Sequence, residues 1–298
     1  MAQTFNPDHV KVYENKDGSI PQKYNELILK EVIDGSQVTK LAKYEQMDGK
    51  EKTFEYFAEA PGAYWVGETE KIKTSTAKWL TCKMEAKKLG VIMPVSREYL
   101  HYSMSNFFEV MKPKIAEAFY KKFDEAVLLN VNNPFSQSLE QSVTESKQII
   151  TGDLDYKNII ALEDAIADED YDLNAFISTK QNNSLLRDGT KNIENGVITE
   201  TLYDRKGSTL DGYPVVDLRS PHMEKGTLYA GDFGYMYYGI PYGMAYKISE
   251  EAQLSTITNE DGSPINLYEQ EMMALRVTMD IAFMIIKDNA FAKIEKKK

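Results

Sequence analysis

Residues 52–96 contain two β-rich stretches separated by a turn-rich segment, and this pattern restricts the possible folds most strongly. The stretches KTFEYFAEA and TAKWLTCKMEAKKLGVIMPVS alternate roughly between apolar and polar residues, as half-buried strands do. Between them, PGAYWVGETEKIKTS carries Pro61, Gly62 and Gly67. We predict a long two-stranded hairpin with a broad tip and arms of about 40–50 Å. Because a two-stranded ribbon buries little surface of its own, we expect a neighbouring copy to support it.

The segment after this hairpin predicts a long helix. In SNFFEVMKPKIAEAFYKKFDEAVLLN, apolar residues recur at spacings of three and four. Pro113 either begins the regular part of this helix or kinks its first turns. Upstream, residues 27–33 predict a short helix that ends at Gly35, within an arm-like segment. We expect the apolar stripe of the long helix to pack into the core; it consists of Phe108, Met111, Ile115, Phe119, Phe123 and Ala126.

Residues 150–298 mix predicted helices and strands, so the fold class is α+β. NIIALEDAIAD predicts an amphipathic helix with Asp153 or Asp155 as its N-cap. NAFIS predicts a short buried strand, and TKQNNSLLRD a helix. TLDGYPVVDLR and GTLYAGDFGYMYYGI predict strands, and further strands surround the turn at residues 261–262. MALRVTMDIAFMII is compatible with either a strand or a helix.

The composition is that of a folded protein without membrane segments. The 298 residues are 42% hydrophobic and 27% charged, enough for one large or two modest domains. No apolar run approaches the roughly 20 residues of a membrane-spanning helix. The start of the sequence lacks a secretory signal. Cys82 is the only cysteine, which excludes an intrachain disulfide. We therefore expect assembly in a reducing cytoplasm.

The net charge of −11 is unevenly distributed. Residues 151–172 carry eight acids and one lysine, and residues 69–90 carry six lysines and two glutamates. An acidic chain is a poor candidate for tight or sequence-specific binding to nucleic acid, which needs clustered Lys and Arg. The two charged segments either guide contacts between copies or form two solvated faces. The sequence leaves both interpretations open.

The usual catalytic and metal-binding patterns are absent. His9, His101 and His222 are far apart and lack metal-ligand spacing. Phosphate-binding glycine motifs and a nucleophile elbow are missing as well. Residues 168–172 place aspartates at the first three ligand positions of a calcium loop, but Leu173 and Thr179 occupy its glycine and glutamate positions. We predict no enzymatic activity, no cofactor and no metal.

Tyrosines are concentrated in YMYYGIPYGMAY, which has two interpretations. Tyrosine side chains can form a platform for sugars, but tyrosine is also common in strands and at protein interfaces. The second interpretation is favoured, and a carbohydrate-active enzyme stays an alternative. The residues concerned are Tyr235, Tyr237, Tyr238, Tyr242 and Tyr246.

Four segments in this order resemble the major capsid proteins of tailed bacteriophages, over residues 5–295. The first and most specific is AYWVGETEKIKTSTAKWLTCKMEAKKLGVIMPVSREYL, with its aromatic-V-G-E tip and its strand KLGVIMPVS. A long helix ending in FDEAVLLN, the segment LDGYPVV and the closing LYEQEMMALRVTMDIAFMIIKDNAFAKI follow. The resemblance implies a tailed-phage capsid fold with an N-terminal arm (1–51), an extended hairpin loop (52–90), a peripheral domain with a long spine helix (91–149 and 241–298) and an axial domain (150–240).

The resemblance also implies a function and its partners. We expect a subunit that assembles through hexamers and pentamers into an icosahedral shell around double-stranded DNA. Many members of the family carry a long N-terminal scaffolding segment that a phage protease removes, and this sequence starts almost at the arm. A separate scaffolding protein or a chain that is already trimmed would explain this. We expect a separate scaffolding protein, with a portal as a further partner. The shell of an encapsulin-like nanocompartment and a phage tail or adaptor component remain rival interpretations.

The hairpin tip holds the residues for which we expect contacts between subunits. Tyr64 and Trp65 are the best anchors, because buried aromatic side chains tend to dominate interfaces. Glu68 is a partner for a basic residue of a neighbour, or a solvated turn residue. Some family members crosslink a loop lysine to an asparagine of a neighbour; Lys71, Lys73 and Lys78 lie in that region. No matching Asn and Glu are identified, so we predict no crosslink.

Overall fold

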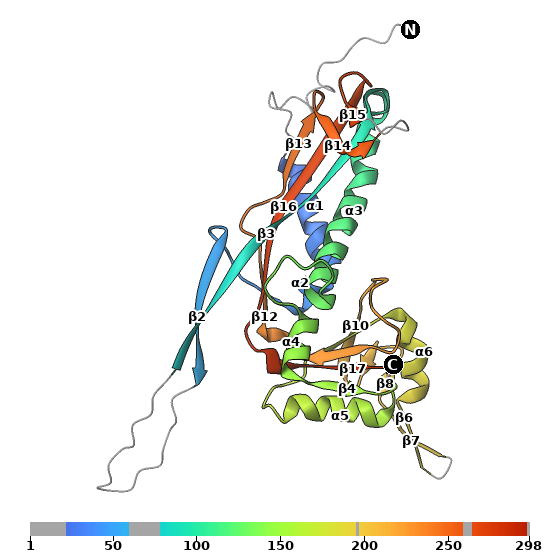
Figure 1. The fold of residues 1–298 in the computed structure, drawn as a ribbon. Coiled ribbons are helices and arrows are strands. Elements are labelled where there is room, and N and C mark those ends of the chain that lie inside the picture. Colours follow the sequence, from blue (N-terminus) through green and yellow to red (C-terminus); the bar gives the residue numbers. More distant parts are fainter. Residues whose placement is uncertain (1–21, 60–77, 195–196, 259–263, 297–298) are drawn as a thin grey trace, which may run out of the picture.

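The computed structural model describes residues 22–59, 78–194, 197–258 and 264–296. They form an elongated molecule with a long sheet at one end and a smaller sheet with its helices at the other (Figure 1). The long sheet has the strand order β1-β12-β16-β3-β2, with β13 also paired to β16. Its strands are β1 (Lys43–Tyr44), β2 (Glu51–Glu59), β3 (Lys78–Ser96), β12 (Met236–Gly239), β13 (Ala245–Ser249) and β16 (Met272–Ile285).

The smaller sheet has seven strands in the order β4-β17-β11-β5-β10-β9-β8. These are β4 (Ile149–Thr151), β5 (Ala175–Ser178), β8 (Tyr203–Asp204), β9 (Thr209–Leu210), β10 (Tyr213–Asp217), β11 (Leu228–Gly231) and β17 (Phe291–Glu295). Two separate hairpins consist of β6 (Lys191–Glu194) with β7 (Val197–Thr201), and β14 (Gln253–Thr258) with β15 (Pro264–Asn266).

Six α-helices lie in the described residues: α1 (Gln22–Gly35), α2 (Gln37–Leu41), α3 (Arg97–Leu129), α4 (Leu139–Ser146), α5 (Tyr156–Ala167) and α6 (Asn183–Gly189). The predicted α+β class is therefore confirmed. Short 3-10 turns occur at Lys180–Asn182, Phe233–Tyr235 and Asp288–Ala290.

The predicted hairpin is present, but its second arm extends beyond the hairpin into the body of the molecule. β2 pairs with the first part of β3, from Glu59 opposite Lys78 to Glu51 opposite Glu85. From Ala86 onward, β3 instead pairs with β16. The described part of the two-stranded ribbon is therefore shorter than the predicted arms, because the second half of β3 pairs with β16 in the body and not with β2. The predicted tip lies outside the described residues.

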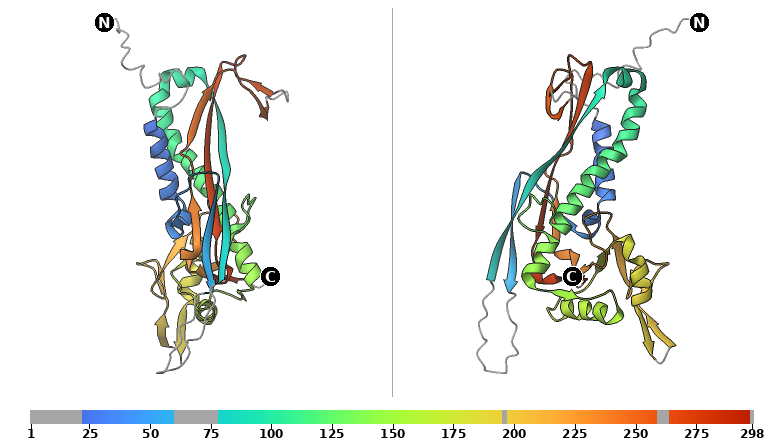
Figure 2. Two further views of the ribbon diagram at one scale, coloured as in Figure 1. Left: turned by 90° about the vertical axis from the view of Figure 1, so that its left-hand side faces the viewer. Right: turned by 45° about the vertical axis from the view of Figure 1, so that its right-hand side comes forward.

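The long helix α3 covers one face of the long sheet, with α1 beside it (Figure 2). It runs unbroken through Pro113 and ends at Asn130, whose φ of 57° terminates it. Ile115, Phe119 and Phe123 are 2–3% exposed, which confirms the core role of this part of the stripe. The short predicted helix near residues 27–33 is also confirmed, as α1.

β16 resolves the ambiguity of MALRVTMDIAFMII in favour of a strand. It lies in the middle of the long sheet, and residues 281–285 are all buried. Ile281 and Phe283 belong to the main core beneath α3, whereas Ala282 and Met284 belong to a second cluster with Met47. With both faces covered, this part of the strand has no polar side to give a period of two.

The smaller sheet combines segments that are distant in sequence. β17 pairs antiparallel to β11 and parallel to β4, so the end of the described chain belongs to this sheet. α5 packs against it and begins at the predicted N-cap Asp155, whose side chain accepts the Asn158 N–H at 2.9 Å. The strand at residues 175–178 and the helix α6 confirm two further predictions. The strands β1, β4, β6, β7 and β8 and the helices α2 and α4 were not predicted.

Candidate assembly surface

The predicted contact residues of the hairpin tip mostly lie outside the described residues. This applies to Tyr64, Trp65, Glu68, Lys71 and Lys73. Lys78 is the first residue of β3, where its backbone pairs with that of Glu59. The structure thus places the start of the ribbon, and the assignment of contacts to its tip stays a prediction.

The described part of the ribbon is charged and faces solvent. Lys83 on β3 forms an ion pair with Glu51 on β2 at 2.7 Å, and Lys87 pairs with Glu85 at 2.8 Å. The hydrogen bond to Glu51 raises the pKa of Lys83, and the hydrogen bond from Lys87 lowers the pKa of Glu85. Lys83 and Glu51 are at least half exposed, so these pairs add little stability. The Lys83–Glu51 pair crosses between the two strands and favours their register, whereas Lys87 and Glu85 both lie on β3. Neither pair anchors the ribbon to the body.

The ribbon is anchored at its base. Met84 is fully buried in a small cluster with Met47, Ala282 and Met284, and Phe54 packs against this cluster. The cluster lies on the face of the sheet opposite α3 and is closed by the segment that carries Met47. Beyond this base, β2 and the start of β3 extend away from the rest of the chain (Figure 1).

The N-terminal helices are held to α3 by a buried carboxylate. Asp124, which is 2% exposed, accepts hydrogen bonds from Ser36 Oγ at 2.5 Å and from the Gln37 N–H at 2.8 Å, at the start of α2. Burial raises its pKa to about 6, although these hydrogen bonds oppose the shift. A Cβ at Gly35 would approach the ring of Tyr120 to 2.5 Å. The turn between α1 and α2 is therefore closely fitted to α3.

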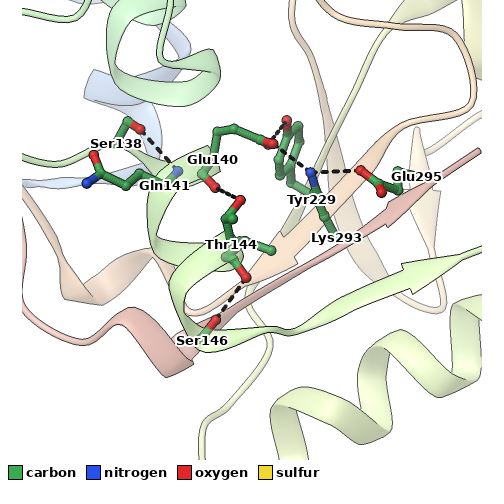
Figure 3. Close-up of polar contacts among 9 residues, drawn as sticks. Ser138, Glu140, Gln141, Thr144, Ser146, Tyr229, Lys293 and Glu295 are labelled. Carbon is green, nitrogen blue, oxygen red and sulfur yellow. Dashed lines mark hydrogen bonds and ion pairs between the residues drawn. The ribbon is translucent and has the colours of Figure 1, made fainter.

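A second buried charge joins α4 to the smaller sheet (Figure 3). The Lys293 ammonium donates to Glu140 Oε1 at 2.6 Å and to Glu295 Oε2 at 2.9 Å, and the Tyr229 hydroxyl donates to Glu140 Oε2 at 2.7 Å. Burial alone would lower the pKa of Lys293, but the two carboxylates raise it. Burial and the Glu140 charge raise the pKa of Tyr229. The charges are compensated, which favours a structural role over a reactive one.

An open cleft of about 500 Å³ separates α2 and α3 from β10 and the residues that follow it. Four cations line it: Lys40, Lys121, Lys180 and Arg219. Two carboxylates, Asp217 and Asp124, also line the cleft, and Asp124 accepts hydrogen bonds from the start of α2. The lining contains no serine, cysteine or histidine. The cleft is a predominantly basic surface.

The tyrosine-rich segment does not form a sugar platform. Tyr238 and Tyr246 are buried, and Tyr235 and Tyr237 are half-buried. Only Tyr242 among the five is well exposed, at 56%. The rings therefore pack as part of strands and their connections, as the favoured interpretation predicted.

Side chains that could bind a metal ion do not cluster in the part of the chain that the structure describes. Within the described ranges, His, Cys, Asp and Glu side chains nowhere gather in threes that could hold a metal ion. Asp168, Asp170 and Asp172 lie exposed in the loop after α5. His222 is exposed too. None of the helices described is long and apolar enough to cross a membrane.

Comparison with known proteins identifies the family. The model of the phage capsid family matches residues 18–296. The chain belongs to the phage capsid family. It is 52% identical over 293 residues to the major capsid protein of Staphylococcus phage 80alpha, an alignment that covers 98% of this chain and 89% of that protein. The resemblance and the function inferred from it are confirmed: this is a phage major capsid protein, a structural component of the virion.

Solved structures show the same fold. A chain of Microbacterium phage Oxtober96 aligns with a TM-score of 0.71 at 22% identity, covering 88% of this chain and 91% of that one. A chain of Mycobacterium phage Adephagia aligns with a TM-score of 0.70 at 18% identity, covering 100% and 95%. These likenesses confirm the overall capsid fold. They give no support to the carbohydrate-active or nanocompartment alternatives.

Proposed function

We propose that this capsid protein assembles through hexamers and pentamers into an icosahedral shell that encloses double-stranded DNA, and that it has no enzymatic activity. The observation that carries the proposal is the β2–β3 ribbon. Its base is anchored by Met84 and its neighbours, and from this base the two strands extend away from the body (Figure 1). A two-stranded element of this kind gains stability when it lies on another surface. In a shell, a neighbouring subunit offers that surface.

Domain roles follow the same proposal. Residues 1–51 form the N-terminal arm and residues 52–90 the extended loop. Residues 91–149 and 241–298 form the peripheral domain around α3, with β17 returning to the smaller sheet. Residues 150–240 form the axial domain, whose copies meet at the hexamer and pentamer axes. The hydrogen bond from the Tyr229 hydroxyl to Glu140 joins the axial domain to the peripheral domain.

Partners are proposed on the same basis. A separate scaffolding protein and a portal take part in assembly, which occurs in the cytoplasm of the host bacterium. The shell contacts DNA without reading its sequence, because a subunit with a net charge of −11 has little overall attraction for phosphate groups. No cofactor or metal is required. Lys71, Lys73 and Lys78 contact neighbours through charge, with Glu68 as an acidic partner.

The tip of the ribbon provides the test. We expect Trp65→Ala to reduce the yield of closed shells at least about tenfold, because a buried aromatic anchor is lost from every copy. Trp65→Phe keeps an aromatic ring and should retain most assembly. Sedimentation separates shells from free subunits, and circular dichroism verifies that the subunit is folded. Normal shells from Trp65→Ala would contradict the anchor role of the tip.

A further inference from the structure

Two cations face each other on the outward side of the long sheet, opposite α3. Lys247 on β13 lies directly across from Arg276 on β16, and both side chains are exposed. Like charges in directly opposed positions destabilise a sheet. Neither cation forms an ion pair with a carboxylate of the described residues. An anion from outside the chain would remove this repulsion.

The two cations border a depression with an apolar floor. Arg276 is also opposite Ile92 on β3, which is 47% exposed, and the next outward position of β16 is Ala274. The β14–β15 hairpin projects from the side of the sheet opposite α3 (Figure 2). Leu254 of β14 forms another part of the lining of the depression. The volume of about 210 Å³ has room for one large side chain. We call this site the basic depression.

A complementary group projects from the same end of the molecule. Residues 267–271, between β15 and β16, form a turn that we call the aromatic turn. Tyr268 is 77% exposed, and Glu269 and Glu271 beside it are exposed as well. The turn thus combines one large ring with two negative charges, and the basic depression combines an apolar floor with two positive charges.

The aromatic turn is held in a defined shape. Leu267 is fully buried against Leu254 and Ala274. The Met272 N–H donates to the Leu267 carbonyl at 2.9 Å, and the Gln270 N–H donates to the Asn266 carbonyl at 3.2 Å. A group that is ordered before it binds loses little conformational entropy on binding. Tyr268 is therefore presented outward on a preformed support.

The acids of the aromatic turn do not neutralise the cations of their own chain. Glu271 and Arg276 are five residues apart along an extended segment, a separation of about 17 Å. Neither glutamate of the turn forms an ion pair with Lys247 or Arg276. The depression and the turn lie at the same end of the molecule, near β13, β14 and β15 (Figure 1). A second copy that approaches with this end can bring its turn to the depression.

We propose that the aromatic turn of one subunit inserts Tyr268 into the basic depression of a neighbouring subunit, where Glu269 and Glu271 pair with Lys247 and Arg276. The inference rests on the proposed shell function and specifies one of its contacts. The two surfaces differ, so the contact is heterologous, and in a closed shell such a contact repeats around a rotation axis to form a ring of subunits. The occupant is a second copy of this chain, because the charges and the apolar groups of the two surfaces match.

Charge exchange tests this contact. We expect Lys247→Glu with Arg276→Glu to lower the yield of closed shells at least about tenfold, and Glu269→Lys with Glu271→Lys to do the same. All four changes together exchange the signs and should restore much of the yield. As a matched control, Glu250→Lys with Glu251→Lys alters two exposed acids outside the aromatic turn and should leave assembly near normal. Thermal unfolding of the free subunits verifies that each variant folds.

The outcomes separate the contact from the shell function. Normal assembly of both charge variants, with normal wild-type shells, would overturn the inference and leave the proposed function intact. Loss of assembly without restoration by the fourfold variant would show that these four charges do not pair with one another, which also overturns the inference. Absence of shells from the wild-type chain, both alone and with its scaffolding protein, would refute the proposed function itself.

A crosslink gives a second, independent measurement. Ile92→Cys and Tyr268→Cys are prepared in separate chains that also carry Cys82→Ser, and the two chains are assembled together. We expect oxidation to produce a disulfide-linked dimer from the mixture, with far less dimer from either chain alone. Equal dimer formation in the mixture and in the single populations would contradict the proposed pairing.

Discussion

Asp124 and Lys293 are charged side chains buried at the two places where separate parts of the chain are joined. Asp124 attaches α2 to α3, and Lys293 attaches β17 to α4. Neither role was predicted from the sequence, because the partners are 87 and 153 residues apart. From the sequence alone, a single acid in an amphipathic helix or a lysine in a short strand is expected to be solvated. Only the fold shows that its hydrogen-bond partner lies close to it.

Replacing Lys293 tests the buried network. Lys293→Met keeps most of the side-chain volume but leaves Glu140 and Glu295 without their cation. We expect the free energy of unfolding of the free subunit to fall by about 2–3 kcal/mol, near the low end for breaking a buried pair, because both carboxylates retain some solvent contact. Urea unfolding measures the change.

The matched control uses an exposed ion pair. Lys121 pairs with Glu117 one helical turn away, and both side chains are at least 40% exposed. Lys121→Met should cost under about 0.5 kcal/mol. Equal costs for the two variants would contradict the distinction between a buried junction and a surface pair.

Asp124 predicts a specific pH dependence of stability. Its pKa rises from 3.8 to about 6 in the folded protein, so the folded state binds the proton more tightly than the unfolded chain. This contribution to stability is present at low pH and is lost as the pH rises through 6. Between about pH 7 and about pH 5.5, wild type should gain about 1 kcal/mol relative to Asp124→Asn, which does not titrate. Urea unfolding of both proteins at each pH measures this difference in the free energy of unfolding. A difference that does not change with pH, or that increases as the pH rises, would contradict the raised pKa of Asp124.

At the scale of elements, the sequence predicted those helix ends and apolar faces that depend on neighbouring residues of the same segment. The N-cap at Asp155, the helix that ends at Gly35 and the stripe at Ile115, Phe119 and Phe123 were all readable from spacing. β16 was ambiguous because its second half is buried on both faces. β4 was missed because it is short and gains its partner from a distant segment.

The assembly surface was predictable only in part. The sequence indicated an extended hairpin and pointed to Tyr64 and Trp65 at its tip, which lie outside the described residues. The basic depression escaped prediction because Ile92, Lys247 and Arg276 come from three strands far apart in sequence. Tyr268 stands next to two acids in the sequence, and this pattern could have marked the aromatic turn.

The two halves of β3 should differ in amide hydrogen exchange. Residues 86–96 pair with the central strand β16 and pack apolar side chains against the main core, whereas residues 78–85 pair only with β2 in the ribbon. In the unassembled subunit we expect slow exchange in the first group and much faster exchange in the second. After assembly, the ribbon should become protected as a neighbour covers it.

Residues of β17 serve as an internal reference, because this strand is buried in both states. Mass spectrometry of matched peptides follows the three segments together. Equal exchange of the two halves of β3 before assembly would refute the division of this strand. Unchanged exchange of the ribbon after assembly would refute its coverage by a neighbour.

At the scale of the whole molecule, proposed contact surfaces lie at opposite ends. The ribbon of β2 and β3 extends toward one end, and the basic depression and aromatic turn lie at the other (Figure 1). The rigid connection between them runs along α3 and the long sheet. An elongated subunit with contacts at both ends can link several neighbours at once, and symmetry multiplies each modest contact into a stable closed particle.

Electron microscopy of the purified chain, alone and together with its scaffolding protein, tests the central claim most directly. We predict closed shells of uniform size, or hexamer and pentamer rings as their precursors, with each ribbon lying on an adjacent subunit in reconstructed particles. A folded chain that stays monomeric under both conditions would contradict the account.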